Sequence, residues 1–260
     1  PYRRQRQLCI RERPIIEFPA VYEMLSVMKA KLDASRCLLY ETARYVDLYK
    51  AYEDIEKERK LTPEEKAELK TYRKYADACT PLAKGLSSEY CNQNAYDCIQ
   101  VHGGSGFMKD YACERVYRDA RITSIYEGTT QLQVVAAIRH VTTGTYKALM
   151  DIYAAMPFSE TLAPVKERLA VLVEKYQAAI DAVQAVNDPA YTDFMARRLV
   201  EMAGNLVMAY LLATDATRYG SESMAKSALV YANMAEAEVN KHSSFIASFK
   251  PEELALYIQA

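Results

Sequence analysis

Glycine is scarce in this sequence of 260 residues, which contains only 8, against ~18 expected at an average usage of ~7%. Tight turns draw on glycine, so a sheet protein of this length would need more of it. The shortage therefore favours long helices joined by a few loops. Half of the glycines fall within one short stretch, at Gly103, Gly104, Gly106 and Gly128. We take that stretch as the first place to look for chemistry.

Other shortages exclude whole classes of function. With 33 basic and 34 acidic residues, the chain has no net field that would recruit nucleic acid or an anionic membrane surface, and we expect neither as a partner. No stretch approaches ~18 uncharged apolar residues, so we expect no membrane span. The six cysteines form no CxxC pair, which is typical of small buried side chains in a reducing compartment. We expect a cytoplasmic protein, or one of the mitochondrial matrix if the source is eukaryotic.

Apolar residues recur at steps of three, four and seven through most of the chain, as they do on one face of a helix. The pattern predicts a long helix from Pro19 and a second that starts at a Thr62–Glu65 capping box, with a kink or break at Pro81. The core face predicted for the first helix carries Val21, Leu25, Met28, Leu32, Leu39, Val46 and Tyr49.

The same pattern predicts further helices over 113–125, 129–143, 162–183, 189–220 and 221–248, with a short last one from 251. Thr129 or Thr130 is the expected cap of the second of these, Asp188-Pro189 the start of the fourth, and Ser221 or Ser223 the cap of the fifth. The apolar face expected for the 162–183 helix consists of Leu162, Val165, Leu169, Leu172, Tyr176, Ile180 and Val183. We therefore predict an all-α protein. Residues 1–150 are expected to form an antiparallel four-helix bundle, and residues 151–260 a second, smaller helical domain. Because the sequence starts at Pro1 without a methionine, we interpret it as the back part of a longer protein.

The glycine-rich stretch lies inside the segment from Gln100 to Gln133. Glycines let the backbone approach a ligand closely and leave N–H groups free to bind anions such as phosphates. The segment has no GK[ST] and no third glycine three residues after Gly106, so it matches neither common nucleotide-binding pattern. For the glycines taken alone, an ordinary helix end and turn is the simpler interpretation.

Metal sites are not indicated by the spacing of candidate ligands. No two histidines lie three to five residues apart, and no Glu-x-x-His occurs, so we expect neither a di-iron carboxylate site nor a zinc site. His102 taken singly is more often a helix cap or a packing residue than a catalyst.

Glu127 is a candidate base. It follows Ile125 and Tyr126, which we expect to be buried, and precedes Gly128, which leaves room for a substrate. A carboxylate flanked by apolar residues loses hydration and becomes a stronger base. The alternative interpretation is a glutamate in a surface loop.

Two motifs of this segment resemble the acyl-CoA dehydrogenase family in its C-terminal helical domain. One is Gln100-Val101-His102-Gly103-Gly104, and the other is YRDARI (117–122) followed by YEGT (126–129) and Gln131. They stand in the family's order and spacing. The resemblance extends over about residues 1–145, and residues 158–260 resemble the extra helical domain of longer members.

The resemblance implies that FAD oxidises an acyl-CoA thioester to its trans-2-enoyl form, with Glu127 as the base that removes the α proton. It implies that Gly128 contacts the substrate and that Thr129 and Gln131 contact the flavin. Residues that match contacts to the FAD of a neighbouring subunit are Gln100, Val101, His102, Gly103 and Gly104. A homo-oligomer, dimer or tetramer, and an electron-transfer flavoprotein as electron acceptor are implied as well.

The sequence also departs from the family. The stretch from Arg6 to Ile10 matches poorly an Arg-Gln-Phe-Gly segment that touches FAD in the family, so that role is not assigned here. The family's N-terminal helical domain and middle β domain have no counterpart in this sequence, and we expect the chain alone to bind FAD weakly or not at all and to have no turnover. Two alternatives stay open: an acyl-CoA oxidase, and a non-catalytic helical interaction module.

Overall fold

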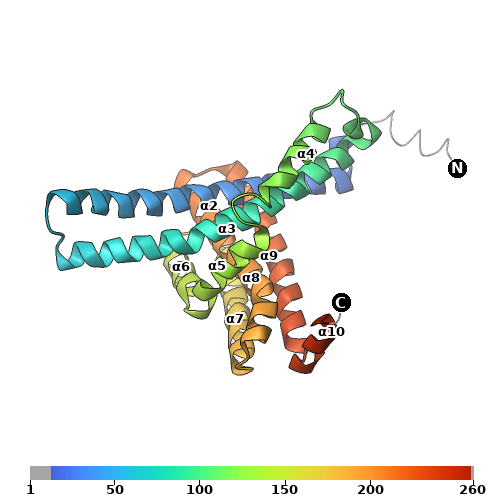
Figure 1. Ribbon diagram of the computed structural model, residues 1–260. Helices are drawn as coiled ribbons and strands as arrows, with labels where there is room; N and C mark the ends of the chain where they lie inside the picture. Colours follow the sequence, from blue (N-terminus) through green and yellow to red (C-terminus); the bar gives the residue numbers. More distant parts are fainter. Residues whose placement is uncertain (1–12, 259–260) are drawn as a thin grey trace.

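The computed structural model describes residues 13–258, and within that range every regular element is a helix. This confirms the predicted all-α class. The stretch over residues 6–10, which matches the family's FAD-contacting segment poorly and includes Cys9, lies outside the described residues. The two longest helices are α2 (Pro19–Glu58) and α3 (Pro63–His102), each of 40 residues. They run side by side in opposite directions, and the other helices gather below and beside them (Figure 1).

The start of α3 is the capping box predicted from the sequence. The Thr62 hydroxyl accepts a hydrogen bond from the Glu65 backbone N–H, and the Glu65 carboxylate accepts one from the Thr62 N–H. Each side chain thereby satisfies a donor that the helix itself leaves unpaired.

The helix α3 continues unbroken through Pro81, so the break that we allowed for is wrong. A proline removes one backbone donor and crowds the preceding turn. Here Pro81 is buried, and the Tyr146 hydroxyl donates to the neighbouring Ala78 carbonyl at 2.8 Å. Packing from other helices therefore outweighs the local preference for a break.

The face of α2 that enters the core differs from the predicted one. Leu32 and Leu39 are 43% and 55% exposed, whereas the buried residues of this helix include Ala30, Ala34 and Leu38. The cause is that α2 packs against α3, α8 and α9, and small alanine side chains allow this close approach. Leu32 and Leu39 instead line an open groove between α2 and α3.

Three shorter helices follow Gly106: α4 (Cys113–Thr123), α5 (Thr130–Thr142) and α6 (Thr145–Ala154). Thr129 caps α5 by accepting from the Leu132 N–H, as one of the two predicted caps. Gly144 adopts a left-handed conformation, φ 71°, where α5 ends. The 113–125 helix ends two residues earlier than expected, because a turn over 124–127 replaces its last residues.

The last part of the chain forms α7 (Ala163–Ala185), α8 (Pro189–Tyr219) and α9 (Glu222–Ser248), followed by a 3-10 turn (Pro251–Leu254) and α10 (Ala255–Ile258). Asp188 and Ser221 cap α8 and α9 with their side chains, as predicted. The apolar face predicted for the 162–183 helix is buried throughout: Leu162, at the end of the 3-10 turn before α7, and Val165, Leu169, Leu172, Tyr176, Ile180 and Val183 of α7.

The helix α8 is the centre of the molecule. It contacts α2, α3, α5, α6, α7 and α9. By length and composition alone it is the one described helix that could cross a membrane, but 89% of its most apolar 18-residue window is buried among the other helices. Its apolar surface is therefore already used by the core.

One buried cluster of side chains runs from α2 to α9. It joins residues on both sides of the predicted boundary at residue 150, through contacts of α8 and α9 with α2 and of α8 with α5. The division into two domains at that position stays a prediction.

Candidate functional site

The candidate base lies in the turn between α4 and α5. Glu127 and Gly128 both have positive φ values, 54° and 96°. Such a conformation costs a residue with a side chain on the order of 1–3 kcal/mol and persists only where the surroundings enforce it. A strained non-glycine residue at this point is therefore a reason to suspect function.

Two side chains hold this turn in place. The Lys84 ammonium, on α3, donates to the Gly128 carbonyl at 2.5 Å, and the Gln133 amide, on α5, donates to the carbonyls of Glu127 and Gly128 at 3.3 and 3.4 Å. Gly85 lets α5 come close, since a Cβ there would lie 3.3 Å from the Gln133 Cβ. Sequence reasoning missed Lys84 and Gln133, because 44 residues separate Lys84 from its partner.

Within the described residues the Glu127 side chain is exposed. Ile125 and Tyr126 are 43% and 52% exposed, so the expectation that they are buried is wrong. The turn presents these apolar side chains outward, together with the carboxylate. The Glu127 backbone N–H has no hydrogen-bond acceptor in the described part of the chain.

Thr129 and Gln131 line a hollow of about 640 Å³ beside the turn. Tyr96, Tyr117 and Arg121 are among its other lining residues, so it offers flat apolar surface together with a cation. The two predicted flavin contacts on α5 are thus brought to one hollow, at the N-terminal end of a helix, where anions are favoured.

Gln100 lines a second hollow, of about 670 Å³, which shares Tyr96 and Tyr117 with the first. Val101 and His102 end α3, and Gly103 and Gly104 begin a 3-10 turn, η2 (Gly103–Phe107). A Cβ at either of these glycines would meet nothing within 4 Å, so the backbone here is open to a ligand. Gln100 of the first motif and Thr129 and Gln131 of the second therefore line adjoining hollows rather than one pocket.

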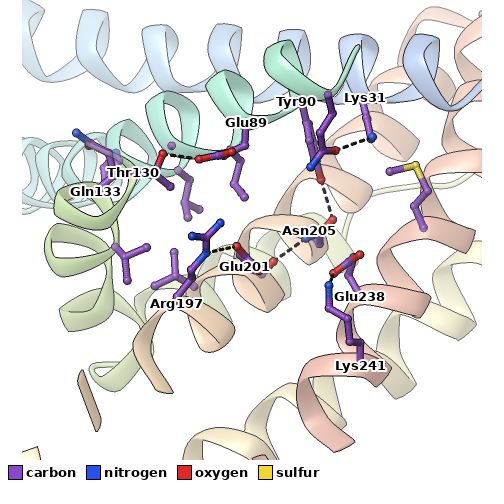
Figure 2. A pocket seen from close by; sticks show the side chains of 18 residues that line it. Lys31, Glu89, Tyr90, Thr130, Gln133, Arg197, Glu201, Asn205, Glu238 and Lys241 are labelled. Carbon is purple, nitrogen blue, oxygen red and sulfur yellow. Dashed lines mark hydrogen bonds and ion pairs between the residues drawn. The ribbon is translucent and has the colours of Figure 1, made fainter. Parts of the chain in front are cut away.

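A polar cavity of about 310 Å³ lies between α3, α5, α8 and α9, with Lys31 of α2 at its edge (Figure 2). Its charged groups are paired with each other or with neutral partners: Thr130 donates to Glu89, Arg197 to Glu201, and Lys31 to Gln93, at 2.6 to 2.7 Å.

Burial shifts the ionisation of two of these groups. It lowers the pKa of the Lys31 ammonium, which the charges of Asp97 and Glu238 offset only in part. Burial also disfavours the charged form of Glu201, but hydrogen bonds from His242 and Arg197 outweigh it and hold the pKa of that carboxyl below its usual value. The Glu201 carboxylate stays charged and is paired with Arg197 of its own helix and with His242 of α9, so it ties α8 to α9 at the wall of this cavity.

The residues at the two hollows fit part of a flavin nucleotide. They supply polar side chains at Gln100, Thr129 and Gln131, a guanidinium at Arg121 and the rings of Tyr96 and Tyr117. A diphosphate needs such donors, and an isoalloxazine ring needs flat apolar walls like those of the tyrosines.

The chain matches two family models. The one described as "Acyl-CoA dehydrogenase, C-terminal domain" covers residues 2–142, and the one described as "Acyl-CoA dehydrogenase C terminal" covers residues 142–254.

Among curated relatives, the caffeyl-CoA reductase-Etf complex subunit CarC of Acetobacterium woodii is 34% identical over 119 residues, which is 46% of this chain and 25% of that protein. The mitochondrial long-chain specific acyl-CoA dehydrogenase of Sus scrofa is 33% identical over 136 residues, 46% of this chain and 32% of that protein. The chain thus spans about a quarter to a third of the length of these relatives.

A solved structure of an acyl-CoA dehydrogenase from Bacillus anthracis, complexed with FAD, shares the fold with a TM-score of 0.68 at 24% identity, over 96% of this chain and 46% of that one. The first family model alone covers more than half of the chain. The chain therefore belongs to the flavin-dependent acyl-CoA dehydrogenase family, in which it corresponds to the C-terminal helical region.

Proposed function

We propose that this chain supplies the catalytic base and part of the flavin site of an enzyme that oxidises an acyl-CoA thioester to the trans-2-enoyl-CoA. The observation that carries the proposal is the strained turn at Glu127 and Gly128, which puts a carboxylate beside the hollow of Thr129 and Gln131. Strain of this kind survives where a function needs the side chain.

Glu127 would remove the proton α to the thioester carbonyl. That proton is far too weakly acidic for a hydrated carboxylate, so the side chain must lose water when the rest of the site closes over it. The negative charge that develops on the thioester oxygen needs fixed donors, and the free Glu127 backbone N–H is one candidate. A bound flavin supplies the acceptor for the hydride that leaves the β carbon.

The flavin is proposed to be FAD, the cofactor named for the Bacillus anthracis relative. Thr129 and Gln131 would contact the flavin that works with Glu127 of the same subunit. The 100–104 segment, of which Gln100 lines the adjoining hollow, would contact the FAD of a second copy of the chain. The proposal therefore includes a homo-oligomer, a dimer or a tetramer.

The electron acceptor is proposed to be an electron-transfer flavoprotein, since the Acetobacterium woodii relative is named as a subunit of a reductase-Etf complex. Because that relative is named as a reductase, the proposal extends to the direction of enoyl-CoA reduction by the same groups. Transfer to oxygen, as in an acyl-CoA oxidase, is the competing outcome.

The test uses the flavoprotein that contains this chain, mixed without oxygen with an acyl-CoA while flavin absorbance is followed. The absorbance should bleach with the native sequence. With Glu127→Gln the rate of bleaching should fall by about 10²–10⁴-fold, as expected for loss of a general base. Glu160→Gln, at an exposed glutamate of the 3-10 turn Glu160–Leu162, is the matched control and should bleach normally.

Normal bleaching by Glu127→Gln would remove Glu127 as the base. Absence of bleaching with the native sequence would favour the non-catalytic module instead. Admitting oxygen after bleaching distinguishes the two electron acceptors. Rapid reoxidation of the flavin by oxygen, with formation of hydrogen peroxide, indicates an oxidase, whereas slow reoxidation indicates a dehydrogenase.

A further inference from the structure

Three side chains that commonly ligate metals gather where α3 ends and α4 begins. Cys98 and His102 lie one turn apart on α3, and Cys113 is the first residue of α4. One potential ligand atom from each lies within 4.8 Å of the other two, and the Cys98 sulfur is 3.9 Å from His102 Nδ1. Neither thiol is in a disulfide, since Cys98 and Cys113 are both free cysteines.

Gly106 is the residue that brings Cys113 to the other two. A Cβ at this position would lie 2.8 Å from both the His102 Cβ and the Ile99 carbonyl oxygen, closer than any other residue permits. The turn can therefore press against the end of α3. The Cys113 thiol then donates to the Gly106 carbonyl at 3.4 Å, which fixes it over Cys98 and His102.

The separations suit tetrahedral coordination. Zn²⁺ binds thiolate sulfur at about 2.3 Å and imidazole nitrogen at about 2.0–2.1 Å, so its ligand atoms stand roughly 3.5–3.8 Å apart. A contraction of about 1 Å or less brings the three atoms to those positions. We propose that Cys98, His102 and Cys113 form a binding site for a thiophilic divalent cation, with Zn²⁺ as the best match and the fourth position left to water.

The charges balance in such a site. Binding releases one proton from each of the two thiols, and the two thiolates neutralise the dication while the imidazole stays neutral. Cys113 is the first residue of α4, an eleven-residue helix, so its backbone position is set by that helix. Ligands of this soft kind select Zn²⁺ over Mg²⁺ or Ca²⁺.

The imidazole is already oriented from two sides. Its Nδ1 lies 2.8 Å from the Cys98 carbonyl oxygen, and the Tyr111 ring stands 5.8 Å from it, centre to centre. Coordination through Nδ1 exchanges that hydrogen bond for the metal. The ion would tie the two ends of the loop over residues 103–112 together, and that loop includes the open backbone of Gly103 and Gly104.

The experiment is a titration of the reduced chain with Co²⁺, which takes the place of Zn²⁺ and is visible by absorption. We expect one Co²⁺ per chain, with sulfur-to-cobalt charge-transfer absorption in the near ultraviolet and the strong visible bands of tetrahedral coordination. Zn²⁺ should displace it and bleach both. Cys98→Ser and Cys113→Ser should each abolish the charge-transfer band or leave it at about half intensity with much weaker binding, and His102→Ala should weaken binding.

The matched control is Cys91→Ser, an exposed cysteine on the same helix, seven residues before Cys98. It should bind Co²⁺ as the native chain does, and circular dichroism shows which variants keep the helical fold. The proposal is overturned if the reduced chain gives no charge-transfer band, or if folded Cys98→Ser and Cys113→Ser variants keep it unchanged. Because the readout is metal binding, it is independent of the flavin assignment.

Discussion

Glu127 combines an unfavourable backbone conformation with the side chain that the proposed reaction needs. Glycine would adopt φ 54° at no steric cost, but glycine has no carboxylate. Lys84 and Gln133 enforce the conformation by binding the carbonyls of the turn. At the scale of single residues, the backbone strain at Glu127 therefore lowers the stability of the fold at the position where the chemistry is expected.

This trade-off predicts that Glu127→Gly stabilises the chain by about 0.5–1 kcal/mol relative to Glu127→Ala, since only alanine keeps the clash of a Cβ in a left-handed conformation. Chemical denaturation of both variants measures the difference. Equal stability of the two would show that the turn is not strained at this residue.

At the scale of helices, close approach is decided by small residues. Gly204 of α8 faces Leu86 of α3, and a Cβ on Gly204 would lie 2.0 Å from the Leu86 Cδ1. Both positions are buried. The glycine, which costs ~1 kcal/mol within a helix relative to alanine, is explained by this contact between the two helices.

Gly204→Ala is expected to destabilise the chain by a net ~1–2 kcal/mol, because overpacking a filled core costs more than the helix preference of alanine returns. Thermal or urea unfolding measures the loss. In combination with Leu86→Ala the penalty of the new methyl group should largely disappear. If the two changes are simply additive, the contact is not the cause.

Gly85→Ala is the comparison within α3. Its Cβ would lie 3.3 Å from the Gln133 Cβ, a tight contact but not a collision, and we expect a smaller loss of stability than for Gly204→Ala.

At the scale of the whole molecule, α8 and α9 pack against α2, and the buried cluster does not stop at residue 150. Residues such as Leu38, Leu149, Leu206 and Val239 share one core. Side chains that share a core lose their packing together.

We therefore expect the chain to unfold in one cooperative transition, with coincident curves by far-ultraviolet circular dichroism and by tyrosine fluorescence. Two separated transitions, or an independently folded piece that ends near residue 150, would instead support two autonomous domains with the predicted boundary.

The sequence by itself determined the helical class, most helix ends and the position of the candidate site. Caps and stop signals act over three or four residues, so Thr62, Asp188, Ser221 and Gly220 could be read directly. The face of α7 could be read as well, because its apolar side chains follow one stripe. The family motifs located Glu127, although the roles of the residues around it stay predictions.

Only the tertiary structure decided which face of α2 is buried, that α3 continues through Pro81, and that Ile125 and Tyr126 point outward. It also decided that Lys84 holds the turn of Glu127 and that Cys113 reaches Cys98 and His102. Each of these depends on contacts between segments distant along the chain or across a tightly folded loop. Local spacing carries no information about such contacts, whereas packing and hydrogen bonding settle them.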